Sequence, residues 1–138
     1  MALDSCHEQV VNALEKAGWD VEKAAYVIEL DRIRVIPDIR ARQINGQIDE
    51  ILVVEVKCFP NEENYQDELY RAIGQYLVYR TIMEMKAVPA KIYMAIPVFV
   101  YNRLFRRQVV AKLFRKRKSG LSSLILSGRK LSNGSANI

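Results

Sequence analysis

Two ionisable residues at alternate positions, Glu55 and Lys57, interrupt a short β-branched and aromatic run at residues 51–59. Alternate side chains of a strand point to the same face, so this carboxylate and this amine leave the strand together. A buried charge is costly unless it is paired or binds a metal. The pattern therefore predicts an internal ion pair, an edge strand with a solvated face, or a catalytic strand on which Glu55 and Lys57 act together.

Asp38 is a second carboxylate that the chain can bring to this strand. It follows a proline and precedes an alternating stretch at residues 39–44, after which Asn45-Gly46 gives a strong two-residue hairpin signal. Such a hairpin pairs the strand that begins near Asp38 with the strand that carries the Glu-x-Lys sequence. Two alternatives stay open: Asp38 is only a turn residue beside a proline, or Asp49 is the carboxylate that reaches the site.

Helical and strand periodicities alternate along the chain and predict one α/β domain with a central mixed sheet flanked by helices. The predicted helices span residues 7–17, 62–86 and 99–118, with a break near Asn102 in the third. The predicted strands span residues 24–30, 32–36, 39–44, 51–59, 90–96 and 121–126. We expect a single domain over residues 1–138, with a core at residues 6–126 and a polar tail at residues 127–138.

The charge of the chain is distributed unevenly. The net charge is +5, but all 16 acidic residues lie at or before Glu84, and the rest of the chain has 12 Lys and Arg residues. Such a basic half is typical of a protein that binds nucleic acid or another polyanion. A solvated basic face or an acidic protein partner would give the same distribution.

The composition is that of an ordinary globular domain, with 50% hydrophobic residues and a mean hydropathy of -0.08. No apolar run reaches the roughly 18 residues that a membrane-spanning helix needs, and the N-terminus lacks the layout of a signal peptide. We therefore expect a cytoplasmic protein. In that reducing compartment the two cysteines, Cys6 and Cys58, are expected to be free thiols.

Together these residues resemble the PD-(D/E)xK nuclease superfamily, with Pro37-Asp38 on one strand and Glu55-Val56-Lys57 on its hairpin partner. More narrowly, the chain resembles the XisH family of element excision controlling factors over about residues 6–118. The matching segments are His7-Glu8, Asn12-Ala13-Leu14, Gly18-Trp19, Glu55-Val56-Lys57, Gly74-Gln75-Tyr76-Leu77-Val78-Tyr79-Arg80 and Tyr93-Met94-Ala95-Ile96-Pro97. Residues 127–138 depart from the family pattern, because they lack the acidic residues and the aromatic residue that members usually have there.

The resemblance implies a restriction-endonuclease-like core that hydrolyses DNA phosphodiesters with Mg²⁺, or with Mn²⁺ in its place. Its implied catalytic residues are Glu8, Asp38, Glu55 and Lys57. The implied metal ligands are Asp38, Glu55 and the Val56 carbonyl. For Glu8 there is a simpler explanation, since a first-turn Glu usually complements the helix dipole.

The resemblance also implies contacts with the substrate. Gln75 and Tyr79 match the Gln-x-x-x-Tyr sequence of the RecB-like branch and are expected to contact a substrate phosphate or Lys57. Both residues would otherwise be ordinary amphipathic helix positions. In the basic half, the expected DNA contacts are Arg103, Arg106 and Arg107.

Membership of this family would imply programmed excision of a DNA element, together with a site-specific recombinase and a companion excision factor of the XisI type. Three functions then compete: a DNA endonuclease or nickase, a non-catalytic DNA-binding accessory factor, and an interaction module that binds the companion factor. A homodimer would suit the first function, because nucleases of this fold often pair to cut two strands.

Overall fold

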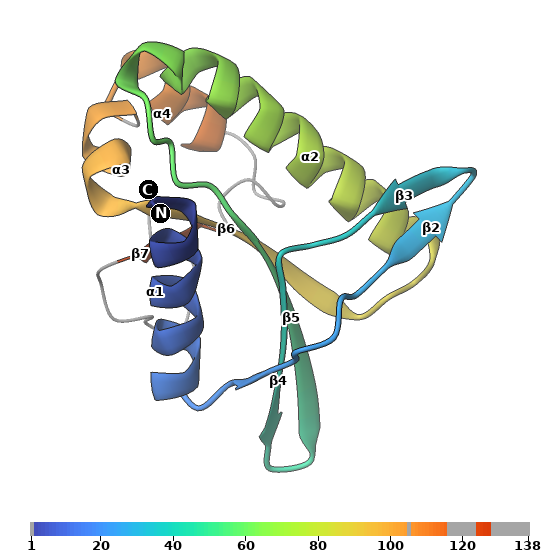
Figure 1. Cartoon of the computed structure of the whole chain (residues 1–138). Helices are drawn as coiled ribbons and strands as arrows, with labels where there is room; N and C mark the ends of the chain where they lie inside the picture. The colour runs from blue at the N-terminus through green and yellow to red at the C-terminus, as the bar shows by residue number, and fades with distance from the viewer. Residues whose placement is uncertain (1, 105, 116–123, 128–138) are drawn as a thin grey trace.

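A computed structural model describes residues 2–104, 106–115 and 124–127 of the chain (Figure 1). The helices are α1 (Ala2–Lys16), the short 3₁₀ helix η1 (Glu62–Asn64), α2 (Tyr65–Met85), α3 (Val98–Leu104) and α4 (Gln108–Arg115). The strands are β1 (Asp20–Val21), β2 (Ile28–Leu30), β3 (Ile33–Val35), β4 (Ile39–Asn45), β5 (Ile48–Val56), β6 (Ala90–Pro97) and β7 (Leu124–Ser127).

The main sheet is mixed and has the strand order β1-β4-β5-β6-β7, which places β5 at its centre. The strand β5 pairs antiparallel with β4 through the predicted hairpin and parallel with β6 on its other side. The α/β class and the central mixed sheet flanked by helices are therefore confirmed. Because β5 and β6 run in parallel, both strands end at the same edge of the sheet.

The two faces of β5 are buried against different helices. Leu52 and Val54 pack in one cluster with Val10 and Leu14 of α1. Val53, on the alternate face, belongs to the larger cluster that contains the buried side of α2. Burial on both faces explains why this strand reads as a continuous apolar run, and it places α1 and α2 on opposite sides of the sheet.

The strands β2 and β3 form a separate hairpin that lies beside α2 (Figure 1). Its two-residue turn is Asp31-Arg32, and both residues have positive φ values of 52° and 63°. These values match the primed turns that suit the twist of a hairpin. The turn near Asp31 was predicted correctly, but the flanking strands, predicted as residues 24–30 and 32–36, have three residues each.

Other boundaries also differ from the prediction. The first helix begins at Ala2 and not at residue 7, the strand predicted at residues 51–59 spans Ile48–Val56, and β1 was not predicted. The β4–β5 turn is Gly46-Gln47, because Asn45 still pairs with Ile48, and Gly46 takes the positive φ of 66°. The helix predicted at residues 62–86 begins as a 3₁₀ turn. The helix predicted at residues 99–118 is interrupted between Leu104 and Gln108 and not near Asn102. The predicted tail lies outside the described residues except for Ser127, which ends β7.

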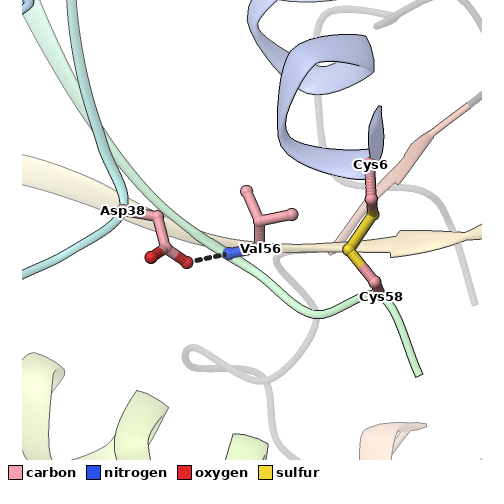
Figure 2. The surroundings of a disulfide bond; sticks show 4 residues. All are labelled: Cys6, Asp38, Val56 and Cys58. Carbon is pink, nitrogen blue, oxygen red and sulfur yellow. Dashed lines mark hydrogen bonds between the residues drawn. A yellow bond between two sulfur atoms is a disulfide. The ribbon is translucent and has the colours of Figure 1, made fainter. Parts of the chain in front are cut away.

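The expectation of two free thiols was wrong, because Cys6 and Cys58 form a disulfide (Figure 2). Their Cα atoms are 6.0 Å apart although the residues are 52 positions apart in the sequence. The prediction rested on the compartment alone, and nothing in the local sequence shows that α1 returns to the end of β5. In the described part of the chain, no helix is long and apolar enough to cross a membrane.

Phe59 anchors the segment between β5 and α2. It is 1% exposed, and its ring meets that of Tyr65 edge to face, with centroids 5.7 Å apart. Its φ of 50° lies in the left-handed region, which is rare for a bulky residue. The core contacts of the ring must therefore outweigh the backbone strain, which is typically about 1–3 kcal/mol.

Replacing Phe59 with Ala should lower the free energy of unfolding by about 3–5 kcal/mol, because the ring is lost from the core while the strain persists. Urea denaturation of the purified full chain measures this change. The matched control is Phe99→Ala, because Phe99 is 59% exposed. The control should change stability by less than about 0.5–1 kcal/mol. Equal losses in the two variants would show that Phe59 is not an anchor of the fold.

Candidate functional site

The site is built around Glu55, the one charged residue buried in the described part of the chain. Its side chain is 7% exposed, and its Oε1 atom lies 3.6 Å from Nζ of Lys57, whose side chain is 24% exposed. Both residues lie on the face of β5 that Val53 also occupies, toward α2, because alternate side chains of a strand share a face. The predicted common orientation of Glu55 and Lys57 is therefore present, and so is an ion pair.

Asp38 lies directly before β4 on the same face as Glu55. The register pairs Ile39 with Val54, so Asp38 stands opposite Glu55 where the hairpin ends. Its Oδ2 atom accepts a hydrogen bond of 2.7 Å from the main-chain N–H of Val56 (Figure 2). The carboxylate thus takes the place of a main-chain acceptor at a point that lies just before the start of β4.

The competing carboxylate, Asp49, lies at the far end of β5, next to the hairpin turn. It is exposed and accepts a hydrogen bond of 2.8 Å from Nε of Arg42. This hydrogen bond lowers the pKa of Asp49. The register therefore selects Asp38 as the neighbour of Glu55.

The carbonyl of Val56 points toward the same open edge of β5 as Asp38. The N–H of Lys57 donates to the carbonyl of Ala95 on β6, at 2.9 Å, so the neighbouring Val56 must direct its main-chain groups toward β4. Its N–H is the one that Asp38 binds. The C=O of a strand residue points to the same side as its N–H. The Val56 oxygen therefore lies at the edge of β5 that extends beyond the start of β4.

Tyr79 reaches the site from α2. It is buried, and a hydrogen bond with Glu55 links the two side chains. Burial, followed by the charge of Glu55, raises the pKa of Tyr79 well above its usual range, so its hydroxyl stays protonated. Gln75 lies one turn earlier on α2 and is exposed. The roles of both residues in substrate binding stay predictions.

Burial raises the pKa of Glu55 from its ordinary 4.5 to about 7, with the charge of Asp38 as the next cause. Lys57 and the hydrogen bond from Tyr79 act in the opposite direction but do not cancel the burial. The Oε2 atom of Glu55 is buried and has no hydrogen-bond partner among the described residues. A second donor or a cation at this oxygen would therefore stabilise the ionised carboxylate.

Glu8 does not lie with these residues. It is exposed on α1, the helix that packs against the sheet face opposite Glu55. Over the residues that the structure describes, no group of three or more His, Cys, Asp or Glu side chains is arranged to hold a metal ion. The sequence shows that α1 is amphipathic but does not show which face of the sheet it covers. A catalytic role for Glu8 stays a prediction that this geometry does not support.

The basic residues predicted to contact DNA are all exposed. Arg103 pairs with Glu62 of η1, which joins α3 to the segment that leaves β5. The helix α3 follows β6 directly, so it begins at the sheet edge where Lys57 lies. Arg106 and Arg107 occupy the connection between α3 and α4.

Sequence reasoning missed Arg40, two residues after Asp38 and on the same face of β4. Its Nη1 atom donates to both carboxylate oxygens of Glu22, at 3.0 and 2.8 Å. Its guanidinium also lies over the ring of Tyr26, with Cζ 4.4 Å from the centroid. The signal was the alternate spacing from Asp38. The resulting cluster braces the strand that delivers this carboxylate.

The model of the XisH family, described as XisH protein, matches residues 1–126. The chain belongs to the XisH family. A crystal structure of an XisH family protein from Nostoc punctiforme PCC 73102 is similar, with a TM-score of 0.71, 21% identity and 88% of each chain covered.

A second crystal structure, of an fdxN element excision controlling factor protein from Anabaena variabilis, has a TM-score of 0.69 and 27% identity. The similarity covers 80% of this chain and 82% of that chain. No curated protein matches the chain. The comparisons thus agree with the XisH resemblance and support the α/β fold over most of its length.

The raised pKa of Glu55 predicts that stability falls as the pH rises. Between the unfolded pKa of 4.5 and the folded value of about 7, the folded chain holds a proton that the unfolded chain has released. From about pH 5 to about pH 8 the free energy of unfolding should therefore fall by roughly 2–3 kcal/mol through this group alone.

Urea denaturation of wild type, Glu55→Gln and Glu15→Gln across this pH range measures the effect. Glu55→Gln should lose the decrease, because the amide does not titrate. Glu15→Gln, which changes an exposed carboxylate on α1, should keep it. If the Glu55 and Glu15 variants follow the same pH dependence, Glu55 does not hold the proton.

Proposed function

We propose that this protein is an element excision controlling factor that cuts or nicks DNA with a divalent cation. Family membership and the similarity to the Anabaena variabilis excision controlling factor support the biological role. The observation that carries the chemical part is the meeting of Asp38, Glu55 and Lys57 on one face of the sheet, at the end of β5. This order of residues on hairpin-paired strands is that of a PD-(D/E)xK nuclease core.

The residues fit a hard divalent cation. Mg²⁺ is usually bound through one or two carboxylates and keeps several waters, so a dedicated cluster of three acidic side chains is not required. Asp38 and Glu55 supply two carboxylates, and the Val56 carbonyl faces the same edge. The buried Oε2 atom of Glu55 has no hydrogen-bond partner among the described residues, so a cation bound there would stabilise the ionised carboxylate. When bound, Mg²⁺ or Mn²⁺ would activate water and neutralise phosphate charge.

Lys57 has the position and the charge to act on the reacting groups. Its amine lies on the face of Glu55 but is more exposed, so it stands between the buried carboxylate and the solvent from which a phosphate would approach. In that place it orients or deprotonates the attacking water, or it stabilises the charge that develops on the phosphate. The hydrogen bond from Tyr79 of α2 would restrain the orientation of the Glu55 carboxylate.

The basic residues on and after α3 would hold the DNA backbone. Phosphate contacts from Arg and Lys position a protein on DNA without reading its sequence. Arg103 lies at the sheet edge of the site, and Arg106 and Arg107 continue the positive surface away from it. The partners in excision would be a site-specific recombinase and a companion factor of the XisI type, and two copies of the chain would be needed to cut both strands together.

Wild-type protein with Mg²⁺ should convert supercoiled plasmid to nicked or linear DNA. Glu55→Gln and Lys57→Ala should each lower the rate by roughly a hundred-fold or more, because each removes a group that acts in the transition state. Agarose gels with time points measure the rates.

Lys91→Ala is the matched control, because it removes an exposed lysine from β6 and should leave the rate unchanged. A rate that is the same in wild type and in both site variants would identify a contaminating nuclease and contradict the proposal. Chelation of the metal should stop the wild-type reaction.

The charge distribution favours a second function, that of a DNA-binding accessory factor without catalysis. Arg106, Arg107 and Lys112 are exposed in the half of the chain that has no acidic residue. This surface would bind DNA whether or not Asp38 and Glu55 take part in catalysis. A companion protein with an acidic face would compete for the same surface.

Replacing Arg106, Arg107 and Lys112 with Gln should weaken DNA binding and reduce the slope of log K against log salt by about 2–3, since each lost phosphate contact removes roughly 0.9. Fluorescence anisotropy at several salt concentrations measures this slope. The matched control replaces Lys23, Arg32 and Arg34, three exposed cations of the other half, and should leave the slope unchanged. Equal slopes in both triple variants would show that the surface formed by Arg106, Arg107 and Lys112 does not bind DNA.

A further inference from the structure

The Cys6–Cys58 disulfide lies beside the proposed site, and the proposed chemistry does not use it. Cys58 follows Lys57 directly, and the cross-link joins it to the helix α1 (Figure 2). Figure 2 also shows Val56, which precedes Cys58 by two residues and whose N–H donates a hydrogen bond to Asp38. A reversible covalent bond thus borders the residues that hold the site.

The disulfide is one of the attachments that hold the chain at the end of β5. Directly after β5, the N–H of Lys57 donates a hydrogen bond to the carbonyl of Ala95 on β6. Two residues later Phe59 takes a left-handed conformation, and the chain turns away toward α2. Between these two points the disulfide links Cys58 covalently to α1, which packs on the opposite face of the sheet.

The other end of the cross-link is firmly held. Cys6 is buried, and Val10 and Leu14, one and two turns later on α1, are almost fully buried against Leu52 and Val54. The helix therefore acts as a fixed support. Through the disulfide it restrains Cys58, and through one peptide unit it restrains Lys57.

We propose that the Cys6–Cys58 disulfide is a redox-operated clasp that positions Lys57 and the main chain of Val56. In the oxidised protein the clasp holds the Lys57 backbone, so its amine stays beside Glu55. In the reduced protein this restraint is lost, while the helix and the sheet remain packed. The effect on catalysis rests on the proposed nuclease function, whereas the effect on the backbone does not.

The switching reaction is thiol–disulfide exchange with a small dithiol. A thiolate of the dithiol attacks one protein sulfur, the S–S bond breaks, and a mixed disulfide forms. This first step frees one of the two cysteines. The second thiolate of the dithiol then attacks the dithiol sulfur of the mixed disulfide and releases the cysteine that was bound to it. Two electrons pass to the protein, two protons complete its thiols, and the dithiol leaves as a cyclic disulfide. Cys58 is the more accessible target, since Cys6 is buried.

Amide hydrogen exchange tests the clasp without any nuclease assay. The ¹⁵N-labelled full chain is measured by NMR when oxidised, after reduction with dithiothreitol, and after reoxidation. Reduction should accelerate exchange at Val56 and Lys57 by roughly ten-fold or more, and reoxidation should restore it. Exchange at Leu52 and Val53, in the middle of the same strand, should change less than about two-fold.

Matched variants separate the clasp from a general loss of stability. Cys6→Ser and Cys58→Ser should each reproduce the exchange pattern of the reduced wild type, and dithiothreitol should then have no further effect. Unchanged exchange at Val56 and Lys57 would overturn the clasp. Equal acceleration at all four amides would also overturn it, because the bond would then stabilise the whole fold. Two thiols that titrate with Ellman's reagent after oxidation would show that the clasp does not form.

The same samples then link the clasp to the proposed reaction. Reduction should lower kcat for plasmid nicking by roughly ten-fold and leave KM for DNA within about two-fold, as expected when only the positioning of Lys57 is lost. A local exchange response without nicking in either state would support the clasp and contradict the nuclease function. Nicking that is equally fast in both states would contradict the clasp alone.

Discussion

The structure depends on one buried carboxylate placed at the centre of the sheet. Glu55 lies on a strand that is packed on both faces, where an ionised side chain without full compensation is costly. Lys57 and Tyr79 compensate only part of this cost, because the pKa of Glu55 stays raised and its Oε2 atom has no hydrogen-bond partner among the described residues. An apolar residue of similar size would often be at least as stable here. Structural stability therefore does not explain the choice of Glu, whereas the binding of a cation would.

The mixed topology gives this carboxylate its surroundings. Because β4 and β5 are antiparallel, their hairpin register carries Asp38 to the position opposite Glu55. Because β5 and β6 are parallel, the chain after each strand emerges at one edge, where η1 and α3 begin and Arg103 meets Glu62. β4 begins only at Ile39, opposite Val54, so the main-chain groups of Val56 lie beyond its start, where a side chain or a ligand can meet them. Acidic and basic residues that are far apart in the sequence thus come to one end of the sheet.

The features that follow from local periodicity could be predicted from the sequence. The alternation within β5 indicates that Glu55 and Lys57 share a face, and the hairpin signal brings Asp38 to it. The exact turn could not be predicted, since Asn45-Gly46 and Gly46-Gln47 differ by one residue, and the structure uses the second. Moving the turn by one residue shifts the register of an antiparallel pair by two residues and so keeps the same faces together, which is why the side of the sheet was easier to predict than the turn.

Features that depend on which face a helix covers could not be predicted in this way. The amphipathic pattern of α1 fits either side of the sheet, so the sequence could not show that Glu8 would lie away from Glu55 or that Cys6 would meet Cys58. These two outcomes have one cause. With α1 on the far face, the Glu8 carboxylate lies away from Glu55, while the N-terminal half of the helix reaches the end of β5. The first helix is therefore connected to the site through a covalent link to the residue after Lys57, and two carboxylates with water would complete the coordination of a hard cation without it.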